Sequence, residues 1–321
     1  MRYLCAAMKA AIYDHYGPAE VVSWRELAEP RPRSHEVLVR VEAAALNPKD
    51  VVVRGGKFRA PSGASFPKQL GHDLAGRVVG LGWRVPTAFA AARVFGFFSG
   101  YRALRGSLSE LTAIPADQVA PIPNQIDVVQ AAAIPLAGST ALQALRDDAG
   151  LLEGEHVLIV GASGGVGTLA VQIAKLMGAQ VTAACSARNF ELVRALGADE
   201  LVDHAAQDPL SRGPFNVVLD CYGKLRAKHV APALRPRGRF VSLVPSRGIV
   251  TDVFLGRVRF PPTRLTRVVP RSADLAQLAT WLAAGSLKPV IDEVYPRDRL
   301  HEAMRHLETR HARGKIVVRM G

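Results

Sequence analysis

Short apolar runs separated by proline and glycine make up the first part of the chain. They combine β-branched and small apolar residues with alternating polar positions, and they lie at residues 9–14, 36–46, 73–82, 92–97 and 107–114. Runs of this length that are bounded by turn residues are typical of β-strands. The pattern therefore predicts a β-rich domain that ends near residue 125.

From residue 127 onward, helical segments alternate with short apolar runs. A helical segment at residues 130–150 comes first, and the runs follow at residues 156–160, 179–185, 200–204, 216–220, 238–244 and 265–269. This alternation is typical of a doubly wound parallel sheet. We therefore predict an α/β protein whose second domain has the Rossmann fold. The helix and strands expected in residues 287–320 are predicted to rejoin the first domain.

One stretch of the second domain, residues 157–174, reads VLIVGASGGVGTLAVQIA and carries no charge, in a chain in which 21% of residues are charged. It is long enough to be considered as a membrane span. Its central glycines argue against a span, because each costs a helix about 1 kcal/mol relative to Ala. The stretch instead divides into a buried strand, a glycine-rich turn and a helix.

A glycine-rich turn between a strand and a helix presents backbone N–H groups and the positive end of the helix dipole to an anion. The usual anion is a dinucleotide pyrophosphate, and glycine permits its close approach. A turn needed only for packing is the alternative, because the motif alone is a weak signal. The apolar run at residues 179–185 supplies the βαβ context that the motif requires, so we predict a dinucleotide site.

The residues after this second strand indicate which dinucleotide binds. NAD sites place an acidic residue roughly 20 residues beyond the motif, whereas NADP sites use a cation or hydroxyl for the 2′-phosphate. No acidic residue occurs between Gly167 and Glu191, and Ser186 and Arg188 follow the strand. We therefore predict NADPH as the cofactor. The alternative for Arg188 is a solvated residue at a helix start.

The chain is basic, with 41 Lys and Arg residues against 28 Asp and Glu residues and a formal net charge of +13. Such a charge attracts polyanions, among them phosphorylated cofactors and nucleic acid. The densest basic region, residues 234–271, lacks the interleaved aromatics of a platform for single-stranded nucleic acid. We interpret it as a solvated arginine-rich surface, with an anion-binding patch as the alternative.

The cysteines and the N-terminus indicate in which cellular compartment we expect the protein. Cys5, Cys185 and Cys221 have no metal-like spacing and cannot all pair with one another. A reducing, cytoplasmic location is therefore the default expectation. Because the N-terminus has no long apolar core, we expect no secretory signal there. Residues 1–7 precede the first patterned strand, and we interpret them as a short upstream extension.

Landmarks along the chain match one family. In order they read GPAEV, EVLVRVEAAALNPKD, LGHDLAGRVVGLG, RVFGF, GSLSELTAIPAD, AAAIPLAGSTALQAL, VLIVGASGGVGTLAVQIAK, CSARNFELVRALGADELVDH, NVVLDCYG, GRFVSL and GKIVV. From about Met8 to its end the chain resembles the medium-chain dehydrogenase/reductase superfamily. Within it, the chain is most similar to the zinc-free branch of NADPH-dependent quinone oxidoreductases and related enone or enoyl reductases.

The resemblance implies a two-domain architecture. A GroES-like β-rich catalytic domain, residues 1–125 completed by residues 286–321, would embrace a Rossmann NADP-binding domain at residues 126–285, with the active site in the cleft between them. Homodimers are common in the family. The strand at residues 265–269 is a plausible dimer edge by resemblance, and an ordinary sheet edge is the alternative.

The same resemblance indicates whether the chain has the ligands of a catalytic zinc ion. Catalytic zinc needs three protein ligands and an open fourth position. In the zinc-dependent branch these are a Cys, the His of a GHE motif and a second Cys. The corresponding places here are Asn47, His72 followed by Asp73, and the neighbourhood of Leu136. Since only His72 remains, we expect no metal at this place, and we interpret His72 as a hydrogen-bonded histidine that supports its turn.

The resemblance also maps a cofactor site onto the second domain. Ser163, Gly164, Gly165 and Val166 correspond to the pyrophosphate turn, and Ser186 and Arg188 to the 2′-phosphate pocket. His204 stands where the family often has a Tyr near the adenine, and an imidazole can bond similarly. Thr140 corresponds to a position near the nicotinamide; a helix-interior Thr bonded to the preceding turn is its alternative.

Asn47 is the predicted catalytic residue. Without a metal, a carbonyl oxygen that gains negative charge needs hydrogen-bond donors, and an amide at the former zinc position can donate to the acceptor or to the nicotinamide ribose. A turn-stabilising Asn before Pro48 is the alternative. Val52 stands where quinone reductases often carry a Tyr, so that proton donor is absent. Lys49 could replace it as a charged donor, although a solvated lysine is the alternative that we favour.

These observations predict a zinc-independent NADPH oxidoreductase that transfers hydride to a quinone or an α,β-unsaturated carbonyl, with a small electrophilic acceptor and a second copy of the chain as partners. An enoyl thioester reductase of the same superfamily is one alternative, differing only in its acceptor. A nucleic-acid or partner-binding protein on a cofactor-binding scaffold is another. It is suggested by the +13 charge but not favoured.

Overall fold

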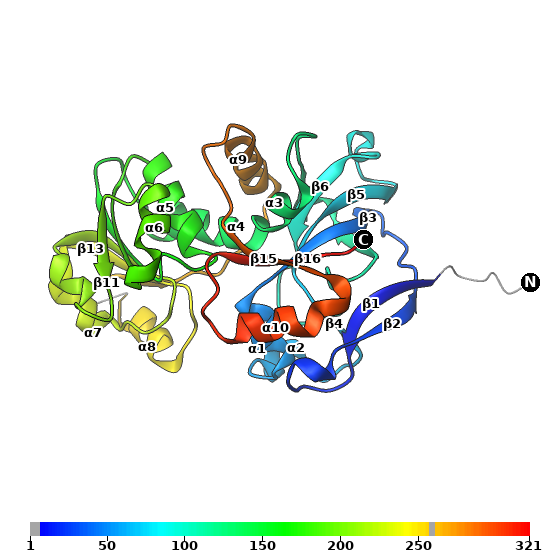
Figure 1. Cartoon of the computed structure of the whole chain (residues 1–321), viewed down its shortest axis with the longest axis horizontal. Coiled ribbons are helices and arrows are strands. Elements are labelled where there is room, and N and C mark those ends of the chain that lie inside the picture. The colour runs from blue at the N-terminus through cyan, green and yellow to red at the C-terminus, as the bar shows by residue number, and fades with distance from the viewer. Residues whose placement is uncertain (1–6, 257–260) are drawn as a thin grey trace, which may run out of the picture. The chain divides into compact units, whose positions relative to one another are not determined.

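The computed structural model describes residues 7–256 and 261–321, which form two compact units (Figure 1). Unit 1 comprises Met1–Leu136, Val269–Gly285 and Ile291–Gly321, and unit 2 comprises Ala137–Val268 and Ser286–Val290. Most of the predicted upstream extension, residues 1–6, lies outside the described residues.

Unit 1 is built on two mainly antiparallel sheets. The smaller has the order β2-β1-β4, with strands Ala7–Tyr13 (β1), Ser23–Ala28 (β2) and Lys68–Gln69 (β4). The larger has the order β15-β16-β3-β5-β6-β8, and β7 pairs with β3 beside that path. Its strands are Glu36–Leu46 (β3), Asp73–Leu81 (β5), Arg93–Phe97 (β6), Leu111–Pro115 (β7), Val119–Pro121 (β8), Ile291–Pro296 (β15) and Lys315–Arg319 (β16).

The C-terminal strand of unit 1 pairs with a strand from near the start of the chain. β16 runs antiparallel to β3, with Ile316 opposite Leu46 and Val318 opposite Ala44. These side chains lie in one apolar core. Their burial offsets the conformational entropy that is lost when so long a loop closes. The helices of the unit are Pro48–Arg54 (α1), Arg59–Ser62 (α2), Val128–Ala132 (α3), Ser272–Ala283 (α9) and Leu300–Glu308 (α10).

Unit 2 contains one sheet of parallel strands in the order β11-β10-β9-β12-β13-β14. In chain order the strands are His156–Val160 (β9), Gln180–Cys185 (β10), Glu200–Asp203 (β11), Phe215–Asp220 (β12), Leu234–Ser242 (β13) and Thr263–Leu265 (β14). This is the 3-2-1-4-5-6 order of the Rossmann fold. Its helices are Pro135–Gln143 (α4, which begins in unit 1), Gly167–Leu176 (α5), Phe190–Ala195 (α6), Ala227–Val230 (α7) and Arg247–Leu255 (α8), with a π-helical turn at Ala144–Asp148.

The predicted fold class is confirmed. The uncharged stretch at residues 157–174 forms β9, a glycine turn and the start of α5. Within the described residues, no helix has both the length and the apolarity needed to cross a bilayer.

The division into units differs from the predicted domain limits. Unit 1 continues to Leu136 rather than ending at residue 125, and it also takes Val269–Gly285, which we expected in the second domain. α9 within this segment packs against β8, the edge strand of the larger sheet. The apolar face of α9 thus finds its partner in unit 1, which its local sequence does not reveal.

Candidate functional site

Three strand ends of unit 1 meet around Asn47. β3 ends one residue before it, β5 begins at Asp73, and β16 begins at Lys315. Because Ile316 lies opposite Leu46, continuing the antiparallel register by one position places Lys315 opposite Asn47. Residues 47, 73 and 315 are distant in sequence, and sheet pairing alone brings them together.

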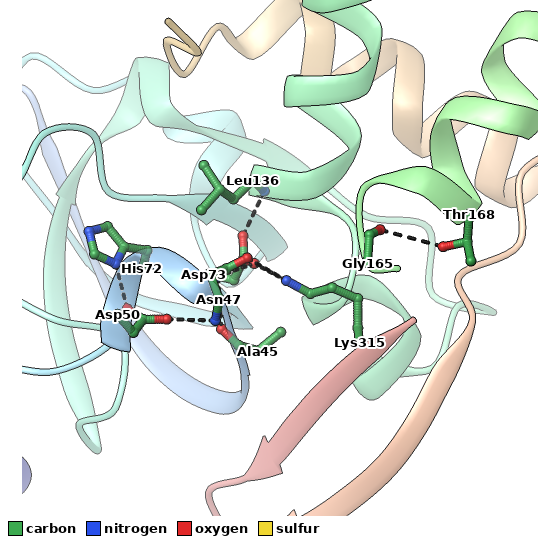
Figure 2. A network of polar contacts seen from close by, with 9 residues as sticks. All are labelled: Ala45, Asn47, Asp50, His72, Asp73, Leu136, Gly165, Thr168 and Lys315. Carbon is green, nitrogen blue, oxygen red and sulfur yellow. Dashed lines mark hydrogen bonds and ion pairs between the residues drawn. The ribbon is translucent and has the colours of Figure 1, made fainter. Parts of the chain in front are cut away.

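Lys315 and Asp73 form a buried ion pair at this point (Figure 2). Lys315 Nζ lies 3.1 Å from Asp73 Oδ2, and the two residues are 4% and 0% exposed. Asp73 also accepts from the backbone N–H of Leu136 at 2.6 Å and from Asn47 Nδ2 at 2.9 Å. Burying two charges is costly, and only such full hydrogen bonding offsets the loss of water.

The side chain of Asn47 is fully engaged in this network. Nδ2 donates to Asp73 and, at 3.2 Å, to the carbonyl of Ala45, while Oδ1 accepts from Lys315 at 2.5 Å. An amide nitrogen carries two hydrogens, so neither is free. To donate to an acceptor, as we predicted from the sequence, Asn47 would have to exchange one of these bonds, and the long bond to Ala45 is the weaker.

Asp50 holds the turn that follows β3. Its Oδ2 accepts from the backbone N–H of Asn47 at 2.7 Å, and its Oδ1 lies 2.5 Å from His72 Nδ1. A carboxylate only accepts, so Nδ1 carries the proton. His72 is 5% exposed and is held by Asp50, which matches the hydrogen-bonded histidine expected from the sequence.

Lys49 lies beside this network on the first turn of α1. It is partly buried, and its Nζ stands 4.9 Å from the centroid of the Tyr101 ring. Burial lowers the pKa of its ammonium to about 8, while the carboxylates of Asp50 and Asp73 act in the opposite direction. The expectation of a simply solvated lysine is therefore wrong, because the side chain is drawn over an aromatic ring.

In unit 2, the turn between β9 and α5 has the backbone of a dinucleotide-binding loop. Gly161 has φ of +79°, and a Cβ on Gly167 would lie 2.1 Å from the Gly161 carbonyl oxygen. The position of Gly161 therefore favours glycine because of its backbone conformation, and that of Gly167 requires glycine for packing. A Cβ on Gly164 would meet only that same oxygen, at 3.4 Å, so this face of the turn has room for a ligand. Gly165 accepts a long, 3.4 Å bond from Thr168 Oγ1 (Figure 2).

Most other predicted cofactor residues gather at the carboxyl ends of β9, β10 and β11. Ser186 Oγ lies 3.3 Å from His204 Nε2. The Ser163 hydroxyl, in the glycine turn, accepts from Asn189 Nδ2 at 2.9 Å, and this leaves its own hydrogen available to an anion. Arg188 is exposed and forms no ion pair or hydrogen bond with the rest of the described chain.

Two predicted cofactor residues lie outside these contacts. Val166 is half-buried next to the start of α5, and Thr140 lies within α4. Sequence reasoning missed Lys315 and assigned no role to Asn189, which is 5% exposed and whose Oδ1 has no partner among the described residues. The position of Asn189 directly after Arg188 was a usable signal, whereas nothing local pointed to Lys315.

The residues of unit 2 suit a nicotinamide dinucleotide. The turn offers room beside Gly164, a hydroxyl at Ser163 and the start of a ten-residue helix, α5, which are the features that bind a pyrophosphate. No group of three or more His, Cys, Asp or Glu side chains in residues 7–256 and 261–321 could hold a metal ion.

Comparisons with known proteins agree with this geometry. Residues 33–124 match the model of the alcohol dehydrogenase GroES-like domain, and residues 196–318 match a model described as zinc-binding dehydrogenase. The chain is 33% identical to the chloroplast envelope quinone oxidoreductase homolog of Arabidopsis thaliana, over 97% of this chain and 98% of the relative.

Two further similarities cover nearly all of this chain. It is 35% identical to the chloroplastic NADPH-dependent alkenal/one oxidoreductase of Arabidopsis thaliana, over 97% of this chain and 79% of the relative. The solved quinone oxidoreductase of Coxiella burnetii superposes with a TM-score of 0.88 at 28% identity, over 98% of this chain and 100% of that one. The chain is therefore an oxidoreductase of the nicotinamide-dependent medium-chain dehydrogenase/reductase superfamily and belongs to its zinc-free, quinone oxidoreductase-like branch.

Proposed function

We propose that this oxidoreductase transfers hydride from NADPH to a quinone or to the β-carbon of an α,β-unsaturated carbonyl, without zinc. The observation that carries the choice of NADPH is the group formed by Ser186, His204 and the exposed Arg188 at the ends of β10 and β11. A hydroxyl, an imidazole and an unpaired guanidinium suit a 2′-phosphate. The names of the Arabidopsis relatives support the two classes of acceptor.

Each part of the site has a proposed task. The reduced nicotinamide, when bound, supplies the hydride. Ser163, Gly164, Gly165 and Val166 hold the pyrophosphate, and His204 contacts the adenine. Thr140 lies near the nicotinamide in this proposal, as the family resemblance implies.

Asn47 remains the proposed residue that orients the acceptor. The buried ion pair of Lys315 and Asp73 fixes its amide plane, and an acceptor oxygen could take the hydrogen now given to Ala45. Such an exchange replaces one hydrogen bond by another and so costs little net free energy.

The test is a titration of the protein with NADPH and NADH at fixed salt. Arg188→Gln should weaken NADPH about 10- to 100-fold and leave NADH unchanged, because charge-assisted bonds contribute roughly 1.5–3 kcal/mol. Arg194→Gln is the control, since Arg194 is likewise exposed but lies at the end of α6. Equal affinities of the wild type for both nucleotides would contradict the NADPH assignment.

The remaining expectations stay predictions. The edge strand of the parallel sheet is β14 at Thr263–Leu265, not residues 265–269 as we predicted. A homodimer through this edge stays a proposal, and a cytoplasmic location rests on the cysteines alone. An enoyl thioester as acceptor stays the alternative within the same chemistry. Nucleic-acid binding would show as a steep salt dependence of affinity, and no contact described above favours it.

A further inference from the structure

The ammonium of Lys49 is an unpaired donor beside the candidate site. Across the described part of the chain it forms no hydrogen bond or ion pair, and it stands 4.9 Å from the Tyr101 centroid. Cation–π attraction acts at this distance and fixes a cation without neutralising it. A lysine held in this way keeps its protons available to a ligand.

Two loops are joined at this place. Phe58, from the segment between α1 and α2, stacks on Tyr101, from the segment between β6 and β7, with centroids 4.8 Å apart and planes at 26°. The backbone N–H of Gln69 also donates to the carbonyl of Ala103 at 2.8 Å. Lys49 therefore lies against one of two stacked aromatic rings that come from different segments of the chain.

The carboxylates near Lys49 are already committed elsewhere. Asp50 accepts hydrogen bonds from Asn47 and His72. Asp73 accepts hydrogen bonds from Lys315, Leu136 and Asn47. Tyr101 is the titratable group that faces Lys49 from the neighbouring loop. Desolvation outweighs the pull of the two carboxylates, and the pKa of Lys49 falls to about 8.

We propose that Lys49 is the proton donor of the reaction, held for that task over the ring of Tyr101. This assignment rests on the proposed function. It also fills a gap in the site, because both amide hydrogens of Asn47 are engaged and Val52 has no acidic hydrogen.

The step balances for an enone. The β-carbon gains the hydride as NADPH becomes NADP⁺, and the electron pair of the C=C bond moves so that the carbonyl oxygen becomes an enolate oxygen. Lys49 transfers one proton from Nζ to that oxygen and becomes a neutral amine. Solvent then reprotonates the amine, and the released enol tautomerises to the saturated ketone. One NADPH and one proton are consumed for each ketone formed.

The test compares wild-type protein with Lys49→Arg and Lys49→Met in the NADPH-dependent reduction of 3-penten-2-one. The proton is present on Lys49 below its pKa, so wild-type kcat/KM should fall as the pH rises through about 8. Arginine keeps the charge but does not titrate there. Lys49→Arg should therefore lose about 100-fold in kcat/KM and lose this alkaline limb, and Lys49→Met should lose at least as much. Lys9→Arg, at an exposed position of β1, is the matched control.

A second readout does not depend on turnover. A ¹³C NMR titration of the lysine Cε atoms, with the Lys49 signal assigned by its absence from Lys49→Arg, should show one lysine titrating near pH 8, against about 10.4 for ordinary lysines. An ordinary pKa for Lys49, or a Lys49→Arg profile equal to wild type, would overturn the assignment. NADPH titration separates the two proposals: wild type that binds no NADPH, or reduces neither enone nor quinone, contradicts the proposed function itself.

Discussion

The buried network around Asn47 and the polar group around Ser163 differ in how completely their hydrogen bonds are made. Around Asn47 the side chains are nearly inaccessible, and the amide and both oxygens of Asp73 have protein partners. Around Ser163, by contrast, Arg188 and His204 are exposed and the hydroxyl hydrogen of Ser163 is left over. The Asn47 network thus satisfies its own hydrogen bonds, whereas the Ser163 group has a cation and a hydroxyl hydrogen without a partner among the described residues.

This difference indicates which property, stability or nucleotide affinity, a variant at each place should change. A satisfied buried network fixes geometry, and breaking it leaves uncompensated charge. An exposed and incompletely bonded group adds little to folding, since surface charges contribute little. Variants of the Asn47 network should therefore change stability first, and variants of the Ser163 group should change nucleotide affinity first.

The largest effect is expected for Lys315→Met. It leaves Asp73 as a buried charge without its cation, and this should lower the free energy of unfolding by about 3–5 kcal/mol. Urea unfolding followed by circular dichroism measures it. Arg319→Met, on the same strand but exposed, should change stability by less than about 0.5 kcal/mol. Similar stabilities for the two variants would mean that the ion pair contributes nothing.

Asn47→Ala should lower stability by about 1–3 kcal/mol, because Lys315 and Asp73 each lose one buried partner. If Asn47 also orients the acceptor, kcat/KM should fall about tenfold or more at a temperature where the variant is fully folded. A loss of stability with unchanged kcat/KM would leave Asn47 as a purely structural residue.

Gly167→Ala and Gly164→Ala separate packing from ligand space within a single turn. The first places a Cβ 2.1 Å from a backbone oxygen and should cost about 1–3 kcal/mol of stability. The second meets nothing closer than 3.4 Å and should leave the melting temperature nearly unchanged while weakening NADPH binding. Thermal melts measure the stability of both variants, and nucleotide titrations measure their affinity for NADPH. An unchanged NADPH affinity in Gly164→Ala would place the pyrophosphate elsewhere.

The smallest effect is expected for Asn189→Ala. The change removes the bond to Ser163 but also removes a buried oxygen that has no partner among the described residues. Since these terms oppose each other, stability should change by less than about 1 kcal/mol. NADPH affinity should fall severalfold, because Ser163 loses the group that orients its hydroxyl. A large loss of stability would show that Asn189 matters mainly for folding.

Much of unit 2 was predictable from the chain alone. The strand, glycine turn and helix at residues 157–174 lie within one βαβ unit, and Ser186 and Arg188 follow its second strand directly. Local patterns suffice there because the ends of adjacent parallel strands meet at one edge of the sheet. The fold class followed from the same local patterns, whereas the family followed from the resemblance of landmarks along the whole chain.

Tertiary structure alone decided the centre of unit 1. Sequence identified Asn47 and His72 by resemblance, but only the pairing of β16 with β3 places Lys315 against Asn47 and Asp73. Likewise, only the packing of two loops puts Tyr101 beside Lys49 and Phe58. The physical reason is that antiparallel pairing and loop packing join residues far apart in the chain, and local hydrophobic patterns carry no record of such partners.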